Sequence, residues 1–192
     1  MKIWWVIGFS VFLAACSTGA QTTDPYASLG DGVPVEGETG AIASYAAEVG
    51  SQKGEQAPDF TINTVDGKDV TLSRLLLDKP VLVYFWTTWC PACQHDLGVM
   101  KEIYPAYKDD FEIIAINMDL DEDENVIRNY LREKPNPGIQ FAAGTEAILR
   151  DYDVIYTSTK VPVGKNGVIL WRGSGEMERD LMVTLFEGLK NS

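Results

Sequence analysis

Residues 81–93 read Val-Leu-Val-Tyr-Phe-Trp-Thr-Thr-Trp-Cys-Pro-Ala-Cys, and this stretch decides the fold. Residues 81–86 show no polar alternation, which is typical of a strand covered on both faces. Pro91 suits the first position of a helix, because its missing N–H would have no intrahelical partner there. The stretch therefore predicts a central strand followed by a helix, with Cys90 at the junction and Cys93 one turn inside.

This placement predicts redox chemistry for the cysteine pair. The positive end of the helix dipole and the free backbone N–H groups favour a thiolate over a thiol at Cys90. Cys90 is then the attacking sulfur, and Cys93 lies close enough to resolve a mixed disulfide. Two intervening residues close too small a loop to add much stability, so a Cys90–Cys93 disulfide is expected to be reversible. The alternative of two inert core thiols does not explain the motif.

The remaining cysteine, Cys16, ends an apolar N-terminal run. The sequence Leu-Ala-Ala-Cys at residues 13–16 resembles the lipobox of bacterial lipoproteins. The resemblance implies a signal peptide over residues 1–15 and a lipid on Cys16, which would anchor the protein to a bacterial membrane on its extracytoplasmic side. An ordinary secretory signal and an uncleaved anchor helix are the alternatives, and all three export the protein.

Composition separates a tether from a domain. Residues 16–54 are rich in Gly, Ser, Thr, Ala and acids, which predicts a flexible tether, with a short helix possible over residues 41–49. Residues 55–192 form the predicted domain. The formal charge of −12 disfavours nucleic acid as a partner. Two cysteines and the single His95 cannot complete a four-ligand zinc site without carboxylates, so we expect no metal and no cofactor.

The pattern after residue 55 alternates strands and helices. The turn signal Asp66-Gly67 predicts a hairpin between residues 60–62 and 70–72. Further strands are expected over residues 111–117, 139–142 and 168–171. Helices are expected after Cys93, around residues 126–131 and 145–152, and at the C-terminus, where Met177, Leu181, Leu185 and Leu189 form an apolar stripe. This order predicts an α/β fold with a central mixed sheet and helices on both faces.

Several blocks resemble a known family: residues 57–60 (Ala-Pro-Asp-Phe), 66–68, 70–72 and 81–86, and the Trp-Cys-Pro-Ala-Cys block at residues 89–93. They resemble the extracytoplasmic thioredoxin-like proteins of the TlpA/ResA type, which are related to AhpC/TSA proteins. The resemblance implies a thioredoxin-like fold with an N-terminal hairpin and exchange with protein disulfides or dithiols. It also implies an external electron donor or acceptor, a role in cytochrome c maturation in some members, substrate contacts at Trp89 and Pro91, and a monomer.

Asp96 stands three residues after Cys93, where ResA-like members carry an acidic residue linked to thiol tuning. One helical turn would bring its carboxylate near the pair. The alternative is ordinary compensation of the helix dipole. Tyr84 occupies the position of the buried acid of cytoplasmic thioredoxins, and His95 is interpreted as a solvated helix residue.

Thr157 and Ser158 depart from the family pattern. A gapless alignment places them where thioredoxins carry a residue followed by a cis-proline that faces the cysteines and shapes the substrate edge. The Ser158 peptide is expected to be trans. A rival register would use Pro162, which otherwise suggests a sheet edge or a break in its strand.

Other functions fit the motif less well. A peroxiredoxin-like peroxidase is the runner-up: Thr87 stands three residues before Cys90, but Val83 occupies the expected proline position. Covalent haem would need His directly after Cys93, where Gln94 stands, and a Sco-type copper carrier would need three residues between the cysteines. A thioredoxin-fold binding module without turnover remains an alternative.

Overall fold

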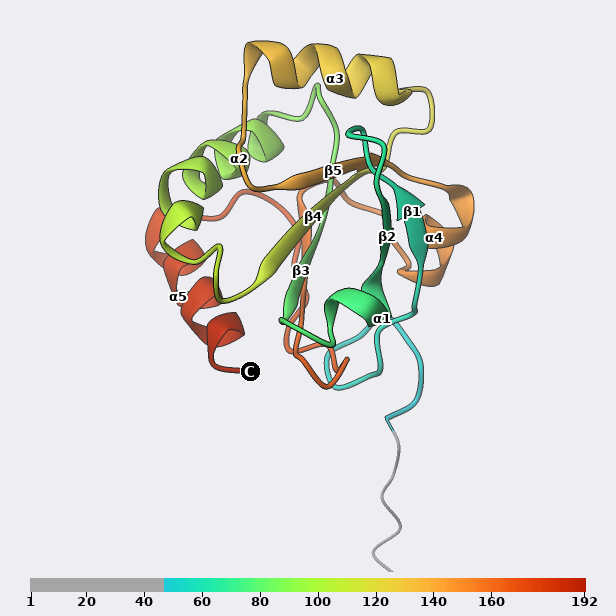
Figure 1. The fold of residues 1–192 in the computed structure, drawn as a ribbon, viewed down its shortest axis with the longest axis vertical. Coiled ribbons are helices and arrows are strands. Elements are labelled where there is room, and N and C mark those ends of the chain that lie inside the picture. Colours follow the sequence, from blue (N-terminus) through green and yellow to red (C-terminus); the bar gives the residue numbers. More distant parts are fainter. Residues whose placement is uncertain (1–46) are drawn as a thin grey trace, which may run out of the picture. The chain divides into compact units, whose positions relative to one another are not determined.

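The computed structural model describes residues 47–192, which are built around a four-stranded mixed sheet (Figure 1). The strand order is β5-β4-β3-β6, with bounds Gln140–Ala143, Glu112–Asn117, Val81–Trp86 and Thr159–Val163. β3 runs parallel to β4 and antiparallel to β6, and β4 runs parallel to β5. The predicted mixed α/β sheet is confirmed.

The strand β3 is buried along its whole length, as its unbroken apolar sequence predicts. Its side chains alternate between two core clusters. Leu82, Tyr84 and Trp86 belong to one cluster, and Val81, Val83 and Phe85 to the other. Because both faces of β3 are covered, the cysteine motif that follows it starts from the rigid centre of the fold.

Different elements cover the two faces of the sheet. One cluster takes side chains from three helices: α2 (Pro91–Ile103), α3 (Glu124–Glu133) and α5 (Arg179–Lys190). The other takes side chains from the hairpin of β1 (Thr61–Asn63) and β2 (Asp69–Thr71), and from α1 (Leu72–Leu75) and α4 (Glu146–Asp151). Helices therefore lie on both faces, and the predicted N-terminal hairpin is present as a separate two-stranded sheet.

Two local predictions are confirmed by the backbone. Gly67 adopts a φ of 78° in the hairpin turn, and its N–H donates to the carbonyl of Thr64. A positive φ is a conformation that glycine adopts without a Cβ clash. The helix α2 ends at Ile103, and a 3₁₀ turn, Tyr104–Ala106, contains Pro105. Pro105 thus ends the α-helix, since it cannot donate the next intrahelical hydrogen bond.

Two other local predictions are wrong in detail. Residues 168–171 form no regular strand: they contact the edge strand β6 through isolated bridges such as Val163 to Ile169. Gly164 lies in the turn between β6 and these residues, and its N–H donates to the carbonyl of Val168.

In α5 the buried residues are Met182, Phe186 and Leu189, whereas Leu181 is 61% exposed and Met177 precedes the helix. The helix is rotated relative to the predicted stripe because Phe186 fills the aromatic core.

The segment before residue 57 contacts the domain. Gln56 bridges to both Val49 and Val168, and the N–H of Gly54 donates to the carbonyl of Ile169. Residues 47–54 were expected to be tether, but contacts with the domain are present from Ser51 onward: the carbonyl of Ser51 accepts the Arg172 side chain at 3.2 Å. The signal peptide, Cys16 and residues 41–46 of the possible short helix lie outside the described residues; residues 47–49 are not helical.

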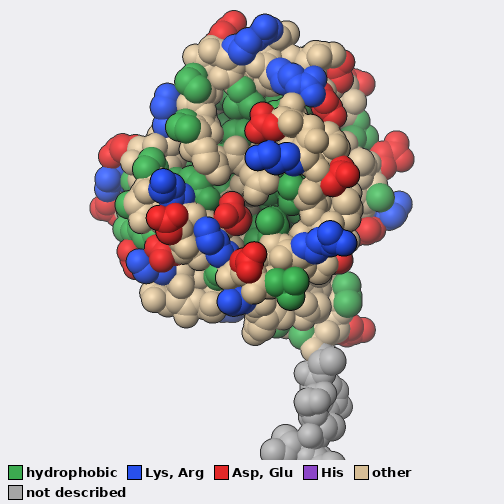
Figure 2. Space-filling model, in the orientation of Figure 1, with side chains coloured by type: hydrophobic (Ala, Val, Ile, Leu, Met, Phe, Trp, Pro, Cys, Tyr) green, Lys and Arg blue, Asp and Glu red, His purple; other side chains and the backbone are tan. Residues whose placement is uncertain are grey.

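The surface in Figure 2 carries acidic and basic side chains interspersed with apolar ones. No helix within residues 47–192 is long and apolar enough to cross a membrane.

Candidate active site

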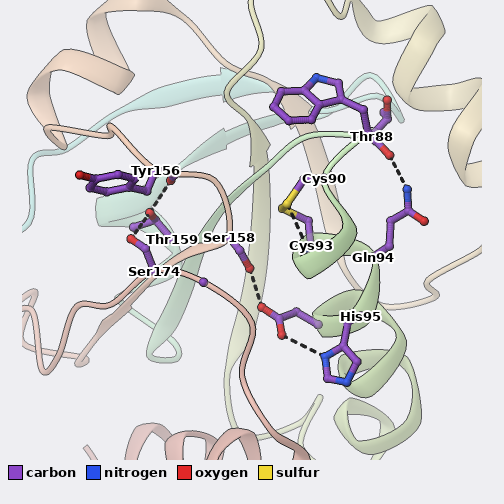
Figure 3. The surroundings of a disulfide bond; sticks show 12 residues. Thr88, Cys90, Cys93, Gln94, His95, Tyr156, Ser158, Thr159 and Ser174 are labelled. Carbon is purple, nitrogen blue, oxygen red and sulfur yellow. Dashed lines mark hydrogen bonds and ion pairs between the residues drawn. A yellow bond between two sulfur atoms is a disulfide. The ribbon is translucent and has the colours of Figure 1, made fainter.

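The cysteine pair lies at the N-terminus of α2, directly after the turn that follows β3. Cys90 is the N-cap residue of α2, with an extended backbone, and Pro91 takes the first helical position as predicted. Cys90 and Cys93 form a disulfide with a Cα–Cα distance of 5.2 Å. The backbone N–H of Cys93 donates to Sγ of Cys90 at 3.1 Å (Figure 3). A free helix N–H directed at Sγ favours negative charge on this sulfur.

Both sulfurs are almost completely buried, and an exposed aromatic side chain directly precedes Cys90. Cys90 is 2% exposed and Cys93 is fully buried. Directly before Cys90, Trp89 is 60% exposed, and its indole N–H donates to Oδ2 of Asp119 at 2.7 Å. A large exposed aromatic side chain held by a hydrogen bond is suited to contact a partner protein.

Hydrogen bonds brace the turn that carries the cysteines. The N–H of Thr88 donates to the Glu122 carboxylate at 3.0 Å, and the Thr88 hydroxyl bonds to the same group. Asn117, at the end of β4, donates to Glu122 at 2.6 Å. On the other side, the Gln94 side-chain amide donates to the carbonyl of Thr88 at 2.8 Å (Figure 3). The neighbouring strand and the helix thus fix the turn.

Asp96 is fully buried and has partners on three different segments. Its Oδ2 accepts the Ser158 hydroxyl at 2.5 Å (Figure 3) and is paired with the Lys160 ammonium group. Its Oδ1 accepts the backbone N–H of Met177 at 2.9 Å and lies 3.5 Å from Nδ1 of His95. A surface carboxylate that only compensates the helix dipole would not need this set of partners. Asp96 therefore belongs to the interior of the site.

Lys160 is the partner that sequence reasoning missed. It lies on β6 opposite Tyr84 and is buried, with its ammonium group 5.6 Å from the centre of the Tyr84 ring. The ammonium group also donates to the carbonyls of Ser158 at 3.1 Å and Gly175 at 2.5 Å. Burial lowers the pKa of Lys160, and the hydrogen bond and charge of Asp96 oppose this shift.

Ser158 directly precedes β6 and is fully buried, with a φ of 57° in the left-handed region. No peptide bond within residues 47–192 is cis, so the bond preceding Ser158 is trans as expected. The Ser158 hydroxyl gives its one proton to Asp96, so the Tyr84 hydroxyl, 3.0 Å away, donates to it. Burial, followed by the charge of Asp96, raises the pKa of Tyr84 and keeps this donor protonated.

The structure brings most of the candidate residues together. The disulfide, Trp89 and Pro91 meet at the start of α2, and Asp96 joins this helix to Ser158. Thr157 is half-buried, and Tyr156 beside it is 69% exposed.

Pro162 does not take the place of Ser158. It pairs with Leu82 inside β6, which is an edge strand, as its sequence suggests. Within residues 47–192 no group of three His, Cys, Asp or Glu side chains is arranged to hold a metal.

Known proteins share both the sequence and the fold. Residues 53–172 match the AhpC/TSA family. The chain is 31% identical over 138 residues to the thiol-disulfide oxidoreductase ResA of Bacillus cereus, covering 71% of this chain and 78% of that protein. A structure described as a thiol:disulfide interchange protein DsbE from Chlorobium tepidum superposes with a TM-score of 0.62 at 27% identity, covering 71% of this chain and 97% of that one.

A second structure, described as a protein disulfide isomerase from Bacteroides thetaiotaomicron, has a TM-score of 0.64 at 26% identity and covers 73% of this chain and 91% of that one. The fold of the described residues is thus thioredoxin-like, as expected. The family match covers more than half of the chain and includes both cysteines. The chain belongs to the AhpC/TSA family and is one of its members of the TlpA/ResA type, whose named relatives are thiol-disulfide oxidoreductases.

Proposed function

We propose that the protein exchanges its Cys90–Cys93 dithiol/disulfide with partner proteins outside the cytoplasm, with Cys90 as the attacking sulfur. The observation that carries the proposal is the N–H of Cys93, which donates to Sγ of Cys90 at 3.1 Å. The helix N-terminus stabilises a thiolate at this sulfur, and the thiolate is the nucleophile in exchange.

In the reductive direction the Cys90 thiolate attacks one sulfur of a partner disulfide. A mixed disulfide forms, and the other partner sulfur leaves as a thiolate and takes up a proton. Cys93 loses its proton and attacks Cys90, which restores the intramolecular disulfide and releases the second partner thiol. Two electrons pass to the partner. An extracytoplasmic dithiol must then reduce the pair again, and the oxidative direction reverses these steps.

Trp89 and the residues around Thr157 are proposed to contact the partner. Trp89 offers an exposed aromatic surface directly before Cys90, and Tyr156 offers another beside Thr157. By contrast, the Ser158 side chain faces inward to Asp96, so only its backbone could take part. Partners of the kind that the family resemblance implies include cytochrome c precursors, which carry a Cys-x-x-Cys pair.

We further propose that the chain is exported, cleaved before Cys16 and lipidated there. The support is the lipobox-like sequence at residues 13–16 after an apolar run. Globomycin-sensitive processing and recovery in the membrane fraction are expected for the wild-type chain. Cys16→Ser should leave the protein unlipidated and prevent this processing. Acylation that persists in Cys16→Ser would contradict the assignment.

An activity assay tests the exchange itself. The reduced wild-type protein should reduce an interchain protein disulfide such as that of insulin, and Cys90→Ser should abolish the reaction. A matched control is Cys16→Ser, which leaves the pair intact and should retain activity. If hydrogen peroxide, and not the protein disulfide, oxidises the reduced pair catalytically, the peroxidase alternative holds. If neither is turned over, the binding-module alternative holds.

A further inference from the structure

A buried ion pair lies behind the cysteine motif and joins two parts of the site. Asp96 is on α2, one turn after Cys93, and Lys160 is on β6, two residues after Ser158. Both side chains are at most 1% exposed. Placing two charges in the interior is costly unless they are paired and their remaining hydrogen-bonding groups are satisfied. Because well-packed apolar residues often stabilise such a place equally well, stability alone does not account for the two charges.

Both members of the Asp96–Lys160 pair have further hydrogen-bond partners. Besides Asp96, the Lys160 ammonium group contacts the carbonyls of Ser158 and Gly175 and the hydroxyl of Ser158. Asp96 accepts from the Ser158 hydroxyl and from the backbone N–H of Met177. The network ties α2 to the chain before β6 and to the segment before α5.

The network lies next to the cysteine pair on two sides. Asp96 and Cys93 are three residues apart on one helix, so their side chains share a face. The backbone at Ser158 directly precedes β6, whose pairing with β3 places it beside the strand that leads to Cys90. Ser158 has the left-handed φ of 57°, and its carbonyl is held by Lys160. A conformation of this kind persists only where the surroundings hold it.

We propose that Lys160 is a positioning residue for thiol exchange: it keeps the Asp96 carboxylate ionised behind the cysteine pair and holds the Ser158 backbone beside it. This inference deepens the proposed function and rests on it. Lys160 touches neither sulfur and acts through Asp96 and Ser158. As long as the Lys160 ammonium group keeps Asp96 ionised, the charge of this carboxylate stays the same over the pH range in which the thiols ionise.

Removing the cation should change how the thiols titrate. A buried carboxylate without its cation takes up a proton more readily, because an unpaired charge in the interior is unfavourable. The other titratable groups that face Asp96 are Cys93 and His95 on α2, Tyr84 on β3 and, through His95, Glu176. His95 is the one other group among these that ordinarily titrates near neutral pH, so it must be controlled for.

The test is the pH dependence of alkylation of Cys90 by iodoacetamide, followed by mass spectrometry between about pH 5 and pH 9, a range that brackets an ordinary thiol pKa. The full chain carries Cys16→Ser and Cys93→Ala, so that Cys90 is the only thiol and no second cysteine titrates beside it, and Cys90 is reduced first. We expect one ionisation in this background and two in Lys160→Met. Protonation of Asp96 should change the rate by roughly tenfold, as expected for a charge near a thiol.

Three variants separate this role from a structural one. Asp96→Asn combined with Lys160→Met should return the profile to one ionisation, and His95→Gln combined with Lys160→Met should keep two. Lys101→Met removes an exposed charge from the same helix and should leave the profile unchanged. A Lys160→Met profile identical to that of the background would overturn the proposal. So would a second ionisation that persists without Asp96.

If Lys160→Met alone does not fold, two other variants test the proposal. Lys160→Arg keeps the charge and should show one ionisation. The Asp96→Asn/Lys160→Met variant removes both charges, which is often tolerated. Its Cys90 ionisation should occur at lower pH than in the background, because Asp96 shares the helix of the pair. Two ionisations in Lys160→Arg would overturn the proposal. So would a double variant in which Cys90 ionises at the same pH as in the background. Trapping of a partner by Cys93→Ala tests exchange independently of Lys160.

Discussion

The hydroxyl of Ser158 donates to the carboxylate of Asp96 at 2.5 Å across a sequence separation of 62 residues. This bond links the helix that carries the cysteines to the residue directly before β6. Both side chains are fully buried, and Tyr84 and Lys160 complete their hydrogen bonding. Ser158, which was expected at the position of the family's cis-proline, is therefore built into the interior of the site.

Ser158→Ala should lower the free energy of unfolding by about 1–3 kcal/mol, because it removes one donor from a buried charged acceptor and leaves the Tyr84 hydroxyl without its partner. Urea denaturation of the oxidised protein measures the change. A loss below about 0.5 kcal/mol, the range of an ordinary surface substitution, would show that the bond contributes little.

Trp89→Ala should raise KM for a protein disulfide while the rate with a small disulfide such as oxidised glutathione stays close to that of the wild type. The reason is that Trp89 is exposed directly before Cys90 and offers contact area only to a large partner. Trp171→Ala is the control, since Trp171 is partly exposed near α5. Equal losses with both disulfides would place Trp89 in the chemistry of the sulfurs instead.

Phe186→Ala should destabilise the protein by about 3–5 kcal/mol, the usual cost of truncating a buried aromatic side chain. The ring lies 4.9 Å from that of Phe111 and 5.5 Å from that of Tyr107, so its removal leaves a cavity under α5. Leu181→Ala on the same helix is the control and should change the stability by less than about 0.5 kcal/mol, because Leu181 is largely exposed. Similar losses for the two variants would contradict the observed orientation of α5.

Asp123→Ala should destabilise the protein near neutral pH and do so less in acid. Asp123 caps α3, and the hydrogen bond from the N–H of Val126 is the main cause that lowers its pKa. The carboxylate form is therefore favoured by folding. Its contribution is present above the pKa of the unfolded chain and is lost as the pH falls through the folded pKa. Unfolding curves at about pH 7 and pH 3 measure the gap between variant and wild type. A gap that is constant with pH would contradict this role.

The fold could be predicted from local signals because they agree with one another. The unbroken apolar run of residues 81–86 gave the central strand, and Pro91 and Pro105 mark the two ends of α2. The prediction was wrong where tertiary packing outweighs pattern. Residues 168–171 resemble a hairpin strand, but their backbone meets β6 only at isolated bridges. The face that α5 buries is set by where Phe186 fits among the other aromatic rings.

The part of the site that depends on local spacing could be predicted, whereas the part that depends on strand pairing could not. The spacing of Cys90, Cys93 and Asp96 is local and can be read directly. Lys160 is brought to Asp96 by the antiparallel pairing of β6 with β3, which places it opposite Tyr84. One signal was available: Lys160 directly precedes the apolar residues Val161, Pro162 and Val163, where an unpaired buried lysine would be costly, and this favours a buried acid as its partner.

Trapping of the mixed disulfide tests most directly whether Cys90 attacks and Cys93 resolves. The reduced Cys93→Ala and Cys90→Ala proteins are each mixed with a disulfide-bonded protein substrate, quenched with acid and analysed for covalent adducts by non-reducing electrophoresis and mass spectrometry. Cys93→Ala should accumulate an adduct through Cys90, because no second thiol remains to release the partner. Cys90→Ala should form none, since Cys93 lies one turn inside α2 and lacks the helix N–H that favours a thiolate at Cys90. Equal trapping by the two variants would contradict the assignment.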